Sequence, residues 1–133
     1  MKLFQSFILI TLLLGSYACT DDSDAAATTS GWKISKYVHN NEDKTSDYTG
    51  YVFDFQSNGV LSATKASSSY NGTWKEVTDS NRTKLVIAFG APSDLVELSE
   101  DWQIVTKTDT SIKLSSTSGN TPNIGIDILE FSK

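Results

Sequence analysis

The clearest β pattern in the chain lies at residues 50–59, which read GYVFDFQSNG. Tyr51, Phe53 and Phe55 alternate there with Val, Asp and Gln, as in a strand that buries one face and exposes the other. Ser57-Asn58-Gly59 follows as a tight turn, because glycine readily adopts the positive φ that a short hairpin loop needs. Residues 60–65 return, so the segment predicts an antiparallel hairpin.

The same period-two pattern extends on both sides of this hairpin, with turn residues at intervals of roughly 8 to 12 positions. It predicts strands at residues 31–38, 50–56, 60–65, 70–77, 84–89, 101–107, 111–115 and 124–131. Short connections make neighbouring strands antiparallel, and an up-and-down meander of about eight strands can close into a barrel without exposed edges. We therefore expect an all-β domain, a small antiparallel up-and-down barrel.

The first and last predicted strands have distinct apolar patterns. On the first, the buried face would carry Trp32, Ile34 and Val38. On the last, the apolar face shifts along the strand, from Ile124, Ile126 and Ile128 to Leu129 and Phe131. A β-bulge, or a strand buried on both sides, would explain the shift.

Three shorter segments complete the predicted fold. Asn71-Gly72 lies within alternating sequence, so we expect a strand with a close backbone contact at Gly72 rather than a turn. Residues 40–47 are polar and predict a loop. Residues 93–98 begin with a candidate N-cap and early acids but are few, so we expect one short helical turn there.

Composition limits the classes of function. Hydrophobic residues make up 38% of the 133 residues and aromatic residues 11%, as in a globular domain rather than a disordered chain. The single cysteine, Cys19, cannot form an intrachain disulfide or a thiolate zinc site. Without Lys2 the chain has 10 basic and 16 acidic residues, a net charge of −6, which disfavours nucleic acid as a partner.

The N-terminus has the three parts of a secretory signal. Lys2 supplies the positive charge, residues 7–14 form an apolar run, and a small residue, Ala18, directly precedes Cys19. A membrane-spanning helix is the alternative, but residues 3–18 are shorter than the roughly 20 residues that such a helix needs. We expect a signal peptide at residues 1–18 and lipidation of Cys19.

Residues 19–30 join this anchor to the barrel domain of residues 31–133. The segment after Cys19 contains Asp21, Asp22 and Asp24, followed by alanine, threonine and serine. Two interpretations remain open: a solvated flexible tether, or an acidic signal that directs export to the cell surface. Both place the domain outside the cytoplasm.

Residues with catalytic or metal-binding chemistry are few. His39 is the only histidine and thus the only neutral-pH general base, but its place beside a polar loop is typical of a surface residue. The densest acidic cluster contains Asp94, Glu97, Glu100 and Asp101, as expected of a solvated surface. One loop has alternating oxygen ligands, as a calcium site might: Asn41, Asp43, Thr45 and Asp47. The loop lacks the glycine and the terminal glutamate of an EF-hand. We therefore expect that the chain is not an enzyme and binds neither a metal ion nor a cofactor.

The large aromatic side chains are the main candidates for a ligand site. They could fill the barrel or line a pocket within it, since an eight-stranded barrel is just wide enough for side chains or for one small ligand. The candidates are Trp32, Tyr51, Phe53, Phe55, Trp74, Phe89, Trp102 and Phe131.

Four segments carry a family resemblance: Gly31-Trp32-Lys33-Ile34, residues 51–59, Asn71-Gly72-Thr73-Trp74 and Asp101-Trp102-Gln103-Ile104. Their order resembles that of the lipocalin-like domains of Bacteroidota lipoproteins. Leu14-Gly15-Ser16-Tyr17-Ala18-Cys19 likewise resembles the lipobox of these lipoproteins. The resemblance implies a small barrel and a Cys19 that carries diacylglyceryl and an acyl chain such as palmitate. It also implies an outer-membrane location, exposed at the cell surface or facing the periplasm.

Two functions fit these expectations. The first is a lipid-anchored, monomeric, extracytoplasmic binding module for a small apolar or amphipathic ligand. The alternative is a surface-exposed structural or interaction module with a filled barrel, whose loops contact protein or glycan.

Overall fold

A computed structural model describes residues 30–117 and 125–133. The predicted signal peptide, Cys19, Asp21, Asp22, Asp24 and Ile124 lie outside these residues. The elements are β1 (Lys33–His39), β2 (Glu42–Asp43), the 3-10 helix η1 (Thr45–Tyr48), β3 (Tyr51–Phe55), β4 (Val60–Lys65), β5 (Ser68–Asp79), β6 (Arg82–Ala88), α1 (Ser93–Val96), β7 (Glu100–Lys107), β8 (Ser111–Thr117) and β9 (Ile126–Ser132).

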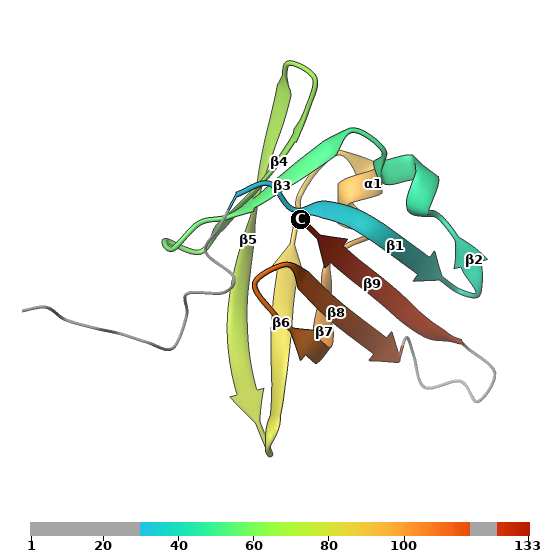
Figure 1. The fold of residues 1–133 in the computed structure, drawn as a ribbon, viewed down its shortest axis with the longest axis vertical. Helices are drawn as coiled ribbons and strands as arrows, with labels where there is room; N and C mark the ends of the chain where they lie inside the picture. The colour runs from blue at the N-terminus through green and yellow to red at the C-terminus, as the bar shows by residue number, and fades with distance from the viewer. Residues whose placement is uncertain (1–29, 118–124) are drawn as a thin grey trace, which may run out of the picture.

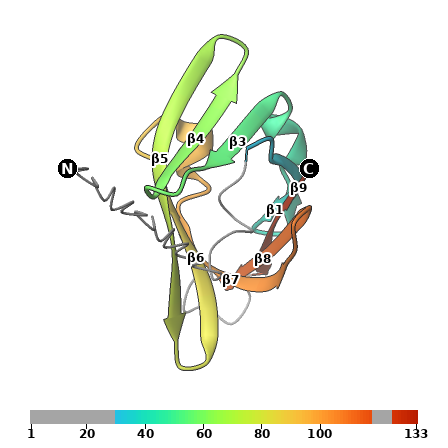
Figure 2. The same ribbon diagram turned by 60° about the vertical axis from the view of Figure 1, so that its left-hand side comes forward.

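The strands form one antiparallel sheet in the order β2-β1-β9-β8-β7-β6-β5-β4-β3. Figures 1 and 2 show the sheet curled around a central axis. Its two ends meet at one bridge, in which Trp32 N donates to Phe53 O at 3.1 Å and Phe53 N donates to Trp32 O at 2.7 Å. The predicted all-β fold is therefore confirmed: β1 and β3 to β9 correspond to the eight predicted strands, and α1 to the predicted helical turn.

The polar segment at residues 40–47 is more ordered than predicted. It contains β2 and the start of η1, rather than a loop alone. Asn40 and Asn41 turn the chain with φ values of 52° and 65°, so that His39 pairs with Glu42. Asparagine tolerates this left-handed conformation, and two such residues form a type I′ hairpin turn.

The predicted buried face of the first strand is wrong beyond Ile34. The register between β1 and β9 shifts between Ile34 and Lys36, so Ser35 is an extra residue in β1. The β-bulge reverses the alternation, and Tyr37 is buried where Val38 was expected. In β9, Leu129 and Phe131 are buried as predicted.

The apolar shift expected in the last strand also has a different explanation. Asp127, Leu129 and Phe131 alternate as the buried face of β9, while Ile126 is 60% exposed and belongs to the outer face. The pairing of β9 with β8 is regular from end to end. The bulge therefore lies in the neighbouring β1, and β9 is not buried on both sides.

Aromatic side chains fill the barrel. Phe131 makes edge-to-face contacts with Phe53 and Phe55, at ring-centroid distances of 5.3 and 5.4 Å. Phe55 contacts Trp74 in the same way, at 5.6 Å. All the aromatic candidates named from sequence are buried: Trp32, Tyr51, Phe53, Phe55, Trp74, Phe89, Trp102 and Phe131.

Residues 90–99 close one end of the barrel. Leu95 and Leu98, in and just after α1, are fully buried. The side chain of Trp102 donates a hydrogen bond from Nε1 to the carbonyl of Leu98, at 2.9 Å. The hydroxyl of Tyr37 donates to the carbonyl of Glu97, at 3.0 Å. These contacts hold residues 90–99 at the end of the barrel, and we call this segment the plug.

Candidate ligand site at the barrel seam

The barrel has a seam where β1 and β3 separate. The Trp32–Phe53 bridge, if continued in antiparallel register, would place Ile34 opposite Tyr51. Within the described residues, the ladder instead stops at this one pair, and β1 continues by pairing with β2. Gly50, with a φ of +87°, leads the chain from η1 into β3. The separation leaves a gap between two strands that are otherwise neighbours.

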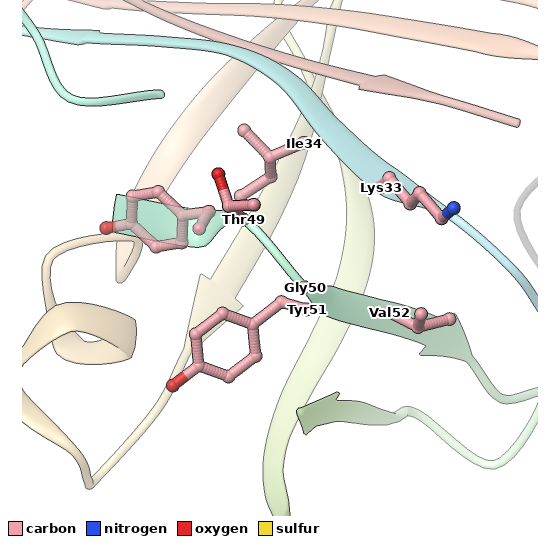
Figure 3. A pocket seen from close by; sticks show the side chains of 7 residues that line it. Lys33, Ile34, Thr49, Gly50, Tyr51 and Val52 are labelled. Carbon is pink, nitrogen blue, oxygen red and sulfur yellow. The ribbon is translucent and has the colours of Figure 1, made fainter. Parts of the chain in front are cut away.

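A pocket of about 370 Å³ lies at this gap (Figure 3). It is lined by Lys33, Ile34, Tyr48, Thr49, Gly50, Tyr51 and Val52. Lys33 and Val52 project from the two strands and are exposed, whereas Tyr51 is buried and its ring points away from them (Figure 3). Tyr48 is also buried. The pocket therefore has an aromatic floor and an open rim with an amine.

Hydrogen bonds to the plug hold the floor in place. The Tyr48 hydroxyl donates to the carbonyl of Asp94 at 2.7 Å, and the Tyr51 hydroxyl donates to Oδ2 of Asp94 at 2.9 Å. Burial, with a smaller contribution from the hydrogen bond to Asp94, raises the pKa of Tyr51 to about 12. Burial also raises the pKa of Tyr48. Both phenols therefore stay neutral at physiological pH, and the two residues add no negative charge to the pocket that they line.

One lysine lines the pocket, and a second lies close to two of its lining residues. Lys33 is on its rim, and Nζ of Lys65 lies 4.8 Å from the centroid of the Tyr51 ring. The Lys65 chain also passes close to Gly50, since a Cβ there would lie 3.8 Å from its Cε and Cγ. In the part of the chain that the structure describes, neither lysine has an ion pair. The rim thus offers positive charge to an anionic group, in a chain whose net charge is negative.

His39 lies in a different cluster, which involves a residue that sequence analysis missed. Its Nδ1 is 2.8 Å from Oδ2 of the buried Asp127, and the Asn40 backbone N–H donates to Oδ1 of Asp127 at 2.9 Å. The Asn40 side-chain amide donates to Nε2 of His39, at 2.9 Å. Both ring nitrogens therefore make structural contacts. The alternation of Asp127 with Leu129 and Phe131 was the available signal, because it places a carboxylate on the inner face.

The predicted acidic groups do not converge on one site. Asp94 accepts from Tyr51, and Glu97 forms an ion pair with Lys44 at 3.0 Å. In the loop considered for calcium, Asp43 Oδ1 accepts hydrogen bonds from the N–H and the hydroxyl of Thr45, at 2.9 and 2.6 Å. Residues 30–117 and 125–133 contain no group of three His, Cys, Asp or Glu side chains placed to hold a metal ion.

Tyr51 is the one predicted aromatic candidate that lines the seam pocket; the others of that set lie in the core. Sequence analysis missed Tyr48, Ile34 and Lys33 as site residues. Lys33 and Ile34 come from β1 and Tyr48 from η1, and the pocket that they share exists because β1 and β3 diverge. No motif in the sequence marks such a divergence.

Comparison of the chain with models of protein families, with curated proteins and with solved structures finds no match. Among the described residues, no helix has the length and apolar character required to cross a bilayer. The interpretation of the site therefore rests on its own geometry.

Proposed function

We propose that the chain is a lipid-anchored, extracytoplasmic binding module, and that its seam pocket binds a small amphipathic molecule with an anionic group. The pocket of about 370 Å³ between β1 and β3 carries this proposal. Its volume falls within the roughly 300–1,000 Å³ that is usual for small-molecule sites, and its lining combines apolar surface with a few polar groups.

The filled interior argues for a site on the barrel wall. Trp32, Phe53, Phe55 and Phe131 are fully buried against one another, in the space that a ligand would occupy in an open barrel. The lipocalin-like resemblance thus enters the proposal as a resemblance of fold, with the ligand moved from the interior to the seam.

The pocket lining specifies the orientation of the ligand. Its apolar part would contact the rings of Tyr48 and Tyr51 and the side chains of Ile34 and Val52. Its anionic group would face the rim, where Lys33 can donate a charge-assisted hydrogen bond.

The anchor and location follow from the N-terminal sequence. We propose that Cys19 carries the acyl chains, since more than one chain gives stable attachment where a single chain is marginal. The tether would hold a monomeric barrel at the outer membrane, on the cell surface if the acidic run after Cys19 acts as an export signal.

Binding of carboxylates tests the pocket. The probes are octanoate and 4-phenylbutyrate, with the matched alcohols, titrated by calorimetry into Cys19→Ala protein lacking residues 1–18. We expect the carboxylates to bind more tightly than the alcohols. Lys33→Ala should remove this preference, whereas Lys36→Ala, at an exposed lysine outside the pocket, should not.

A second pair of variants tests the location of binding. Val52→Trp should block the pocket, whereas Val105→Trp, at a side chain that is 58% exposed on β7, should leave binding unchanged. Equal affinity in wild type and Val52→Trp would refute the seam site. Native mass spectrometry of the protein purified from its own host would then identify any molecule that it retains.

The filled interior also favours the second candidate function, a structural or interaction module whose loops contact protein or glycan.

A further inference from the structure

Two adjoining hollows lie over β5 to β8, and most of the side chains that line them are on the face of the sheet opposite the core. One, of about 340 Å³, is lined by Arg82, Lys84, Glu100, Asp101, Gln103, Ser115 and Ser116. The other, of about 270 Å³, is lined by Lys75, Val77, Asp79, Lys84, Val86 and Asp101. They share Lys84 and Asp101, so they form one elongated surface that is separate from the seam pocket.

Unequal strand pairing accounts for this shape. β6 pairs with β5 over seven residue pairs, from Thr73–Ala88 to Asp79–Arg82, but with β7 over only four, from Lys84–Gln103 to Ile87–Glu100. The β5–β6 hairpin therefore continues beyond its ladder with β7 and projects from the barrel (Figures 1 and 2).

The pairing register places both signs of charge on this surface. Val86 pairs with Lys75 on one side and with Asp101 on the other. In the next row, Lys84 pairs with Val77 and with Gln103, which itself pairs with Ser115. Lys84 and Asp101 are thus diagonal neighbours on adjacent strands, a separation that long side chains can span.

Most polar side chains of the hollows have no side-chain partner among the described residues, although Asp79 accepts a hydrogen bond from the Ser80 hydroxyl at 3.0 Å. Among the described residues, no side-chain hydrogen bond or ion pair involves Lys75, Arg82, Lys84, Glu100, Asp101, Gln103 or Ser115. Elsewhere on the barrel, opposite charges do pair, as in Lys44–Glu97 and Lys113–Glu130. The surface therefore combines free cations, carboxylates, an amide and a hydroxyl, with the methyl groups of Val77 and Val86 between them.

We propose that this surface, hereafter the outer groove, binds a neutral linear oligosaccharide. Sugar hydroxyls both donate and accept hydrogen bonds, so they can use carboxylates as acceptors and ammonium, guanidinium and amide groups as donors. The C–H faces of a sugar ring would lie on the two valines. A polyanion is disfavoured by Asp79, Glu100 and Asp101, and a polycation by Lys75, Arg82 and Lys84. Two hollows in contact fit at least two linked sugar units.

Titration with uncharged oligosaccharides tests the outer groove. The probes are gluco- and manno-oligosaccharides of one to four units, measured by calorimetry with the Cys19→Ala protein. We expect one of these series to bind, with affinity rising from one unit to two as the second hollow is filled. Asp101→Asn and Gln103→Ala should each weaken binding by about tenfold, because each removes or weakens a hydrogen bond that the sugar makes.

Matched variants control for charge and folding. Asp109→Asn removes the same charge as Asp101→Asn, but in the β7–β8 turn. Lys84→Met should weaken binding because it removes an ammonium donor, and Lys36→Met is its control. Both controls should bind as wild type. Val52→Trp at the seam should also leave oligosaccharide binding unchanged. No binding at millimolar concentration, equal binding by Asp101→Asn and wild type, or binding of sulfated saccharides alone would overturn the proposal.

Discussion

Trp32 and Phe53 close the barrel with a reciprocal pair of backbone hydrogen bonds, of 3.1 and 2.7 Å, and both side chains are fully buried. The Trp32 ring lies 6.5 Å from that of Phe55, and the Phe53 ring 5.3 Å from that of Phe131. The residues that join the ends of the sheet therefore also belong to the core. Closure of the sheet and packing of the core should therefore occur together during folding, because the domain is too small to hold a second core.

Truncation of the core aromatics should destabilise the protein strongly. We expect Phe53→Ala, Phe55→Ala, Trp74→Ala and Trp102→Ala each to lower the free energy of unfolding by about 3–5 kcal/mol, because each leaves a cavity among packed rings. Val105→Ala, at an exposed position, should change it by about 0.5 kcal/mol or less. Urea denaturation measures both. Losses below about 2 kcal/mol at all four core positions would indicate a loose or hydrated interior.

Gly72 should not tolerate even a methyl group. The prediction of a close backbone contact there is confirmed, since a Cβ would lie 2.4 Å from the carbonyl oxygen of Ala88 and 2.6 Å from the Phe89 ring. Gly72→Ala should cost about 1–3 kcal/mol, because the two strands must move apart. Gly90→Ala is the control, since its Cβ would meet nothing within 4 Å. Equal melting temperatures for the two variants would contradict this account.

High pH should weaken the plug. Burial raises the pKa of Tyr51 to about 12, from an ordinary value of 10.0, and also raises that of Tyr37 and Tyr48. Between pH 10 and 12 the unfolded chain loses phenolic protons that the folded chain keeps, so the free energy of unfolding falls as pH rises. Below pH 10 the buried tyrosines make their full contribution to the free energy of unfolding. Tyr51→Phe should make this fall shallower in urea melts, and an unchanged pH dependence would contradict the assignment.

The sequence predicted the barrel because the strands follow one physical rule, alternation of buried and exposed side chains, over most of their length. It failed where a single inserted residue changes that alternation: the bulge at Ser35 buries Tyr37 in place of Val38. The candidate sites were harder to predict. The seam pocket depends on where two strands diverge, and the outer groove on how far β5 and β6 extend past β7, and both are properties of pairing between distant segments.

The acidic run after Cys19 offers a test of location. If the run acts as the proposed export signal, replacing Asp21, Asp22 and Asp24 with Ala should move the domain from the cell surface to the periplasmic face. The substitutions should not unfold the domain, since these residues precede the barrel. Digestion of intact cells with an external protease, followed by immunoblotting, measures exposure of the domain. Equal digestion of the variant and the wild type would leave the run as a plain tether.

Cys19→Ala should release the protein from membranes. In the proposed lipoprotein the anchoring free energy would come from the acyl chains, at about 0.8 kcal/mol for each buried methylene group, and alanine has no thiol to receive the diacylglyceryl group. We expect wild-type protein to stay with membranes after a carbonate wash, with an N-terminal mass that includes the acyl chains. The variant should appear in the soluble fraction without them. Ser23→Ala, in the same segment, should behave as wild type. Retention of Cys19→Ala in the membrane would show that residues 3–18 remain as an anchor in their own right.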